Sequence, residues 1–311
     1  MSGSNLSRRQ AWVAAARPQT LPAAAAPILV GVGLAVNDGV FAPVPAVAAF
    51  IGAALIQIGT NFANDYYDAI QGADTDDREG FTRVTQSGLI EPGRVKAAMY
   101  LTFAAAVVVG GYLVYVGGVP ILVIGLLSVI SGIAYTGGPY PLGYHGLGDL
   151  FVFVFFGVIA VTGTYYVQAA AALAAPLATT VPPGTITLEA VVASLPIAAI
   201  STNILVVNNI RDKAEDETTG KRTLAVRFGY GFSRAEYIGL LGVAYLVPVW
   251  LWLAADASVA VLLPLVTLPV AIRVAETVRT ETSGTALNPA LETTGKLLAG
   301  YALLFGVGLA V

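Results

Sequence analysis

Two short stretches of this sequence carry acidic and amide side chains, and each lies at the end of a long apolar run. In the first stretch, Asn61, Asn64, Asp65 and Asp68 follow the i, i+3, i+4, i+7 pattern, which places all four on one face of a helix. The stretch 208–216 forms a similar face. Such groups are costly in hydrocarbon unless they face water, a cavity or cations. The two faces together predict one polar site built from both stretches.

Oxygen donors of this kind indicate a site for a metal-bound diphosphate. Mg²⁺ is usually held by only one or two carboxylates, with waters and phosphate oxygens completing its shell. Opposed across a cavity, the two faces predict Mg²⁺ that neutralises a diphosphate leaving group as an allylic carbon–oxygen bond breaks. The candidate cations for the remaining phosphate oxygens are Arg78, Arg83, Lys221 and Arg222. For any single acidic residue, a solvated helix end balanced by nearby Lys and Arg is the alternative interpretation.

The composition is that of a membrane protein. Of 311 residues, 56% are hydrophobic and 11% are charged, whereas soluble domains carry about 25% charged residues. The chain has no cysteine, which excludes disulfides, thiolate metal sites and cysteine nucleophiles. The sequence therefore predicts an all-α, polytopic membrane protein, and no nucleic-acid partner is expected.

Nine apolar runs are long enough, or nearly long enough, to span a bilayer. They are 20–36, 43–63, 97–117, 119–136, 150–171, 188–207, 236–254, 257–275 and 295–311. The pairs Asn64/Asp68 and Asp212/Asp216, each at i, i+4, follow the second and sixth runs. This correspondence predicts one domain over 1–311, with two four-helix halves around a central cavity and a ninth helix added. The two halves are expected to be weak repeats covering about 11–136 and 147–275.

The charged residues predict how the chain is oriented. With nine spans and an inside N-terminus, all 16 Lys and Arg residues lie in or beside the inside segments. The outside loops contain only Asp38, Glu189 and Asp256 as charged residues. By the positive-inside rule, the N-terminus and both polar stretches are expected in the cytoplasm, and the C-terminus outside the cell membrane.

The two polar stretches resemble the motifs of a known family. Asn64-Asp65-Tyr66-Tyr67-Asp68 and Asp212-x₃-Asp216-x₃-Gly220-Lys221-Arg222-Thr223 are similar to the two aspartate-rich motifs of the UbiA superfamily of intramembrane aromatic prenyltransferases. Their order, their separation and their positions after the second and sixth spans match as well. Further supporting stretches are 16–22, 135–139, 141–144 and 220–229. Within the superfamily, the chain most resembles the prenyltransferases of menaquinone synthesis.

The resemblance implies nine transmembrane helices around a cavity that opens to lipid, with Mg²⁺ bound through both motifs. It also implies transfer of a polyprenyl group from its diphosphate to 1,4-dihydroxy-2-naphthoate, with loss of the carboxylate, giving demethylmenaquinone. Matched position by position, Asn64, Asp68, Asp212 and Asp216 are the expected metal ligands. Asp68, Asp212 and Asp65 are the expected catalytic residues.

Substrate binding is predicted for eight residues near the motifs: Arg17, Arg78, Arg83, Tyr135, Tyr144, His145, Lys221 and Arg222. Arg83 matches a basic position of the loop after the first motif, although Val84 replaces a proline common in relatives. His145 is the only histidine and a candidate general base, with a polar turn residue as the alternative. Arg17 is expected either to bind a substrate carboxylate or diphosphate, or to anchor the first span at the interface.

Two other functions remain open from the sequence. The first keeps the fold and changes the acceptor to 4-hydroxybenzoate, homogentisate, a glycerol phosphate lipid or a chlorophyllide. The second is a transporter of cations or lipid intermediates, which would place carboxylates within the spans, whereas these lie at span ends. The phenylalanines of the fifth span are expected to line a prenyl channel or to pack against lipid and helices.

Overall fold

A computed structural model describes residues 7–71 and 84–311 of the chain, and every regular element in these ranges is a helix. The α-helices are α1 (Arg8–Ala16), α2 (Leu21–Asn37), α3 (Pro43–Gln71), α4 (Pro92–Ala134), α5 (Gly148–Val152), α6 (Ala160–Leu173), α7 (Leu188–Thr218), α8 (Leu224–Ala254), α9 (Leu268–Thr280) and α10 (Gly284–Ala310). Tighter or wider helical segments are η2 (Pro18–Thr20), η3 (Leu142–His145), η4 (Phe153–Ile159) and η5 (Val259–Thr267). The predicted all-α, multi-pass membrane architecture is confirmed.

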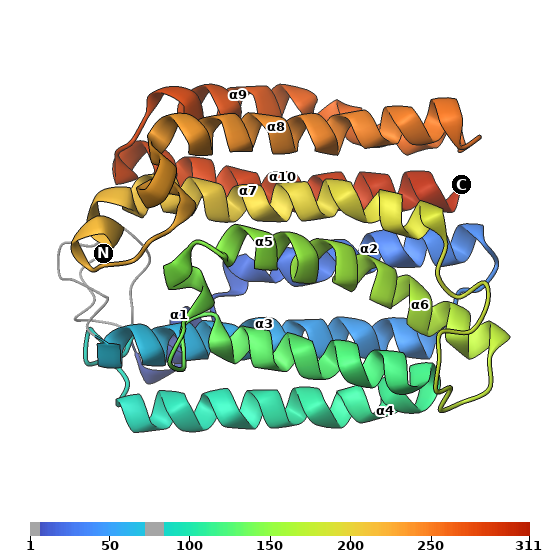
Figure 1. Cartoon of the computed structure of the whole chain (residues 1–311), viewed down its shortest axis with the longest axis horizontal. Coiled ribbons are helices and arrows are strands. Elements are labelled where there is room, and N and C mark those ends of the chain that lie inside the picture. The colour runs from blue at the N-terminus through green and yellow to red at the C-terminus, as the bar shows by residue number, and fades with distance from the viewer. Residues whose placement is uncertain (1–6, 72–83) are drawn as a thin grey trace.

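The nine predicted spans form eight helical runs, because two of them belong to one element. The described residues contain eight helical runs that are long and apolar enough to cross a membrane. The difference lies in α4, where the expected spans 97–117 and 119–136 form one element of 43 residues. At Gly118 the backbone leaves the helix (φ 67°, ψ −155°), and the chain doubles back there (Figure 1). Only glycine adopts this conformation readily, so one residue turns the chain between the two arms.

The helices lie side by side with their axes nearly parallel (Figure 1). In that view α8 and α9 form one edge, α7 and α10 lie next to them, and α3 and α4 form the opposite edge. Packing links α3 with α4, α7 with α8, and α10 with both α2 and α7. Both motif-bearing helices, α3 and α7, finish at the same end of the bundle, so the fold brings the two polar stretches together. The predicted repeat of two halves stays a prediction.

Small residues let neighbouring helices approach each other closely. A Cβ added to Gly33 of α2 would lie 2.2 Å from the carbonyl oxygen of Gly306 in α10. A Cβ added to Gly157 in η4 would lie 2.1 Å from the Cβ of Ala198 in α7. Lipid tails are as apolar as the helices, so close van der Waals packing of this kind drives their association.

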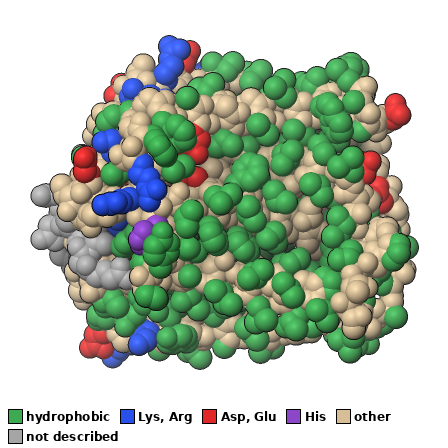
Figure 2. All heavy atoms as spheres, in the orientation of Figure 1, with side chains coloured by type: hydrophobic (Ala, Val, Ile, Leu, Met, Phe, Trp, Pro, Cys, Tyr) green, Lys and Arg blue, Asp and Glu red, His purple; other side chains and the backbone are tan. Residues whose placement is uncertain are grey.

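The charges on the surface are divided between the two ends of the bundle. Figure 2 shows Lys and Arg side chains gathered at the end where α3 and α7 finish, whereas only acidic side chains mark the other end of this face. Hydrophobic side chains cover the band between them. This division agrees with the predicted partition of basic residues, while the orientation in the cell stays a prediction.

Candidate functional site

A polar cavity of about 190 Å³ lies between the ends of α3 and α7. Its wall contains the four residues predicted as metal ligands, Asn64 and Asp68 from α3 and Asp212 and Asp216 from α7. The other lining residues are Arg17, Tyr135, Thr136, Gly143, Tyr144, Leu205, Asn208, Asn209, Arg211, Lys221 and Thr223. The structure thus brings two motifs that are far apart in the sequence to one cavity.

The first motif is held by the segment that follows α4. The hydroxyl of Tyr144 donates a hydrogen bond of 2.5 Å to Oδ1 of Asp68, whose side chain is buried. The hydroxyl of Thr136 donates one of 2.9 Å to the amide oxygen of Asn64. Because Asn64 and Asp68 are four residues apart on α3, both face this segment, which fixes their orientation.

Asp65, which was predicted to be catalytic, lies outside the wall of the polar cavity. It is 1% exposed and is absent from the wall of the polar cavity. Its carboxylate accepts hydrogen bonds from the backbone nitrogens of Val84 and Thr85, both 3.1 Å, and from the Thr85 hydroxyl at 2.6 Å. Successive residues of a helix point about 100° apart, so Asp65 cannot share the direction of Asn64. It anchors the 84–85 segment instead.

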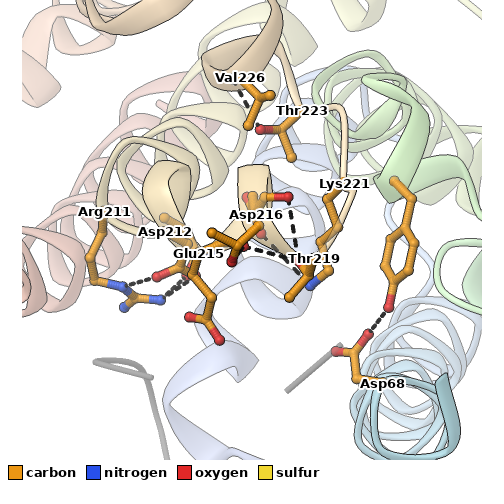
Figure 3. A network of polar contacts seen from close by, with 12 residues as sticks. Asp68, Arg211, Asp212, Glu215, Asp216, Thr219, Lys221, Thr223 and Val226 are labelled. Atoms are coloured by element: carbon orange, nitrogen blue, oxygen red, sulfur yellow. Dashed lines mark hydrogen bonds and ion pairs between the residues drawn. The ribbon is translucent and has the colours of Figure 1, made fainter. Parts of the chain in front are cut away.

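A buried ion pair organises the second motif. The Nε of Arg211 lies 2.6 Å from Oδ1 of Asp212, and its Nη2 lies 2.8 Å from Oδ2, so the pair is bidentate (Figure 3). The same guanidinium donates from Nη2 to Asn208 at 2.7 Å and from Nη1 to Asn288 of α10 at 2.8 Å. The fixed fork of arginine donors therefore sets the orientation of the Asp212 carboxylate and ties α10 to the site.

Lys221 lies between the two motifs. Its Nζ is 3.8 Å from Oδ1 of Asp216 and 4.9 Å from the centre of the Tyr144 ring. Figure 3 shows it between the α7 carboxylates and Asp68. The chain returns over the end of α7 because Gly220 adopts φ 78° and the Lys221 backbone nitrogen donates 2.9 Å to the carbonyl oxygen of Asp216. The ammonium group of Lys221 is thereby held between the two acidic motifs.

Tyr135 follows the last residue of α4 and belongs to the cavity wall. Burial raises the pKa of its phenol above the usual range, and the carboxylates of Asp149, Asp216 and Asp68 raise it further. The hydroxyl is therefore protonated at neutral pH and can donate a hydrogen bond to a ligand in the cavity.

Asp149 is buried and accepts a long hydrogen bond of 3.5 Å from Asn209. Asp149 is not among the site residues predicted from the sequence, although it lies at the start of an apolar span.

His145 does not belong to the wall of the polar cavity. Its Nδ1 lies 2.8 Å from the carbonyl oxygen of Pro141, and its ring stacks on that of Tyr140 with 3.6 Å between the ring centres. These contacts are those of the polar turn residue that the sequence left as the alternative.

Of the predicted substrate-binding residues, the structure brings Arg17, Tyr135, Tyr144 and Lys221 to the polar cavity. Arg222 is exposed, and its backbone nitrogen donates to the carbonyl oxygen of Tyr144. Arg78 and Arg83 lie outside the described residues.

A larger, apolar cavity of about 460 Å³ adjoins the polar one. Its wall comes from α2, α3, both arms of α4, α5, η4 and α6. Tyr135 lines both cavities, so they meet at this residue. Phe151, Phe155 and Phe156 line the apolar cavity, as expected for a channel, whereas Phe153 does not. The pair of cavities suits an amphipathic ligand with an anionic end and a hydrocarbon chain.

The donor set of the polar cavity suits a hard cation that shares its shell with phosphate. Within 7–71 and 84–311, no group of three or more His, Cys, Asp or Glu side chains could hold a metal ion by itself. Mg²⁺ does not require such a group, because one or two carboxylates usually suffice when waters and phosphate oxygens complete its shell. Asp68 on one wall and Asp212 with Asp216 on the other match this manner of binding.

Comparison with known proteins gives full-length relatives. The 1,4-dihydroxy-2-naphthoate octaprenyltransferase of Escherichia coli (strain K12) is 37% identical to this chain, over 99% of the chain and 98% of that protein. The protein of the same description from Mycobacterium tuberculosis is 38% identical, over 96% of each. UbiA prenyltransferase domain-containing protein 1 of Homo sapiens is 29% identical over 96% of this chain and 83% of that protein.

Solved structures share the fold at low sequence identity. The apo structure of a UbiA homolog from Aeropyrum pernix K1 has a TM-score of 0.67 and 14% identity, covering 92% of this chain and 96% of that one. A UbiA homolog from Archaeoglobus fulgidus bound to DMAPP and Mg²⁺ has a TM-score of 0.59 and 15% identity, covering 95% and 99%. The profile of the UbiA prenyltransferase family matches residues 24–290. With that match and these full-length relatives, the chain belongs to the UbiA prenyltransferase family.

Proposed function

We propose that this membrane enzyme transfers a polyprenyl group from polyprenyl diphosphate to 1,4-dihydroxy-2-naphthoate, with release of diphosphate and carbon dioxide, giving demethylmenaquinol, the reduced form of demethylmenaquinone. The acceptor follows the descriptions of the Escherichia coli and Mycobacterium tuberculosis relatives, which align with nearly the whole chain. One observation carries the proposal: both acidic motifs line a single polar cavity, and that cavity meets an apolar one at Tyr135.

The polar cavity is the proposed site of the diphosphate. Asn64, Asp68, Asp212 and Asp216 would hold Mg²⁺, which when bound neutralises the charge of the leaving diphosphate. Support comes from the donor set and from the related Archaeoglobus fulgidus homolog, which was solved with DMAPP and Mg²⁺. Lys221 lies between the motifs and is suited to contact phosphate oxygens by charge-assisted hydrogen bonds.

The apolar cavity is the proposed site of the prenyl chain. Its wall is almost entirely hydrocarbon, so it excludes water from the allylic cation that forms when the carbon–oxygen bond breaks. The reacting carbon would then lie near Tyr135, where the cavities meet. The electron-rich naphthoate ring attacks this carbon, and loss of its carboxylate as carbon dioxide restores the aromatic ring and completes the transfer.

The enzyme is proposed to lie in the cell membrane with its N-terminus and polar cavity on the cytoplasmic side and its C-terminus outside. The gathering of Lys and Arg at the polar end of the bundle supports this orientation. A single cysteine placed at Val311 tests it in intact cells, because an impermeant thiol reagent should label that residue from outside.

The direct test of the site is alanine substitution of Asp68 and of Asp212 in the purified protein. Each variant is expected to lose Mg²⁺-dependent prenyl transfer by about 100-fold or more, because each removes a ligand that neutralises the leaving group. Glu217→Ala is the matched control, since Glu217 lies on α7 but is exposed. Wild-type turnover by either aspartate variant would contradict the two-motif site.

The acceptor is tested separately. Membranes that contain the protein are incubated with radiolabelled polyprenyl diphosphate and one acceptor at a time: 1,4-dihydroxy-2-naphthoate, 4-hydroxybenzoate, homogentisate or a glycerol phosphate lipid. Labelled product is expected with the naphthoate. Labelled product with another acceptor and none with the naphthoate would contradict the proposed acceptor while leaving the prenyltransferase activity intact.

A further inference from the structure

Arg17 joins α1 to α2 in a left-handed backbone conformation, with φ 50° and ψ 67°. Among the described residues, only two other non-glycine residues have positive φ, Leu177 and Asp256. A residue with a side chain disfavours this conformation, which persists only where surrounding contacts enforce it. Because Arg17 also lines the polar cavity, the unusual backbone coincides with a site residue.

Three polar side chains enclose this turn. Thr20 donates from its backbone nitrogen and from its hydroxyl to the carbonyl oxygen of Arg17, both at 2.9 Å. The Nδ2 of Asn61 donates to the preceding carbonyl oxygen, that of Ala16, at 3.0 Å and to the Thr20 hydroxyl at 2.9 Å. The Nε2 of Gln57 donates to the Thr20 hydroxyl at 3.1 Å and to the Asn61 oxygen at 3.3 Å. We call these three residues the Thr20–Gln57–Asn61 cluster.

The hydroxyl of Thr20 is the centre of this cluster. It donates its one proton to the Arg17 carbonyl and accepts from both carboxamides, so its full hydrogen-bonding capacity is used. The second link between the turn and α3 is the hydrogen bond from Asn61 to the carbonyl oxygen of Ala16. A side chain of the same shape as Thr20 without a hydroxyl would therefore remove the link between the Arg17 carbonyl oxygen and α3 and leave the one to Ala16.

The two carboxamides belong to the same face of α3 as the first motif. Gln57, Asn61, Asn64 and Asp68 are spaced i, i+4, i+7, i+11, which keeps them on one stripe of the helix. Gln57 is 7% exposed and Asn61 is 3% exposed. Burying two amides within a membrane helix costs free energy, and their hydrogen bonds to the Arg17 turn offset part of that cost. The position of this turn is therefore a structural reason for the two amides. One stripe of α3 thus carries two of the proposed metal ligands and two residues that hold the turn of Arg17, which lines the same cavity.

We propose that Thr20, Gln57 and Asn61 are positioning residues for Arg17, and that they thereby set how tightly the polar cavity holds an anionic group of a substrate. This inference rests on the proposed function, in which the substrates carry a diphosphate or an aromatic carboxylate. Thr20 and Asn61 act through Arg17 and line neither cavity, whereas Gln57 also lines the apolar cavity.

The kinetic test compares Arg17→Leu, Asn61→Leu, Thr20→Val and Thr20→Ser, with each substrate varied in turn. Arg17→Leu, Asn61→Leu and Thr20→Val are expected to raise the KM of the same substrate by about tenfold and to change kcat little, because each weakens a contact to one anion. An increase in the KM of the prenyl donor identifies the diphosphate as that anion, and an increase for the naphthoate identifies the carboxylate. Thr20→Ser keeps the hydroxyl and should behave as the wild type.

A double-mutant cycle separates positioning from a general structural role. Asn61→Leu combined with Arg17→Leu should have the KM of Arg17→Leu alone, because the first substitution acts only through the second residue. If the fold-increases in KM of the two single variants multiply in the double variant, the two residues act independently and the proposal is overturned. Should Asn61→Leu fail to fold, Thr20→Val is combined with Arg17→Leu in the same cycle, because it changes the side-chain volume very little. Thr20→Ser combined with Arg17→Leu is the control.

A chemical readout tests the cluster without relying on turnover. The chain contains no cysteine, so Arg17→Cys introduces a single thiol. Its conversion to a mixed disulfide by a cationic methanethiosulfonate, with release of methanesulfinate, should be slowed by inorganic pyrophosphate with Mg²⁺, and Thr20→Val or Asn61→Leu should abolish that protection. Unchanged protection in both backgrounds would overturn the positioning role. If the protection changes as expected but Arg17→Leu leaves both KM values at wild type, the substrate contact of Arg17 is wrong while the positioning role stands.

Discussion

The hydroxyl of Tyr144 lies 2.5 Å from Oδ1 of Asp68, so the segment after α4 is fastened directly to the first acidic motif. Tyr144→Phe removes this hydrogen bond and keeps the ring that lies beneath Lys221. Loss of a hydrogen bond to a charged group should lower kcat/KM by about tenfold or more. Tyr140→Phe is the control, because Tyr140 belongs to the same segment and is 55% exposed. Steady-state kinetics of the two variants decide the matter, and equal kcat/KM values would contradict a role for the Tyr144 hydroxyl.

Asp65 and Asp68 are predicted to differ in what they support. Asp65→Asn places an amide group among three donors from Val84 and Thr85, so the unfolding temperature in detergent should fall. The Mg²⁺ concentration for half-maximal activity should stay at the wild-type value. Asp68→Asn should raise that concentration. If Asp65→Asn also needs a higher Mg²⁺ concentration for half-maximal activity, Asp65 has the catalytic role predicted from the sequence.

The bidentate pair of Arg211 and Asp212 predicts a large effect on stability. Arg211→Leu leaves the Asp212 carboxylate buried without its cation, which should cost about 3–5 kcal/mol of unfolding free energy. Lys213→Ala removes an ion pair to the exposed Glu217 on the same helix and should change stability little. Thermal unfolding of both variants gives the comparison. Equal unfolding temperatures would mean that the burial of this pair contributes nothing to the fold.

Helix packing predicts an unequal response of two glycines to the same substitution. A Cβ at Gly33 would lie 2.2 Å from the Gly306 carbonyl oxygen, whereas nothing lies within 4 Å of a Cβ at Gly239. Gly33→Ala should therefore separate α2 from α10 and lower the unfolding temperature. Gly239→Ala should not lower it, because alanine is the better helix former. The reverse order would exclude close packing of α2 on α10.

The length of the prenyl chain should respond to the volume of the apolar cavity. Gly163 of α6 lines this cavity, and a Cβ there meets nothing within 4 Å. Gly163→Leu fills part of the cavity, so kcat/KM for a long prenyl diphosphate should fall relative to that for geranyl diphosphate. Gly239→Leu, which lies outside the cavity wall, should leave the ratio unchanged. Competition between the two donors, with mass analysis of the products, measures the ratio directly.

Much of the fold could be predicted because its signals are local. Long apolar runs and the one-sided distribution of Lys and Arg give the helices and their grouping at two ends. The pairs Asn64/Asp68 and Asp212/Asp216 stand out because helical spacing places each pair on one face. The number of helical runs is one fewer than the nine predicted spans because a turn at the single residue Gly118 joins two arms into one element.

The remaining parts of the site depend on contacts that leave no local signal. Asp65 has the residue type of a ligand, yet its direction on α3 takes it to Thr85 instead of the cavity. Arg211 looks like one of many basic residues at a helix end, and only the tertiary fold brings Asn288 to its guanidinium. His145 is unique in the sequence, but its ring is turned to Pro141 and Tyr140.

The hydrogen bond from Arg211 to Asn288 makes α10 a structural support of the polar cavity. α10 stands outside both predicted halves, and none of the four proposed ligands comes from it. A version of the protein cut before Gly284 would keep every one of those ligands, yet Nη1 of Arg211 would lose its acceptor and α2 its closest neighbour. Any shortened form of the enzyme should therefore retain α10, although none of the four proposed ligands belongs to it.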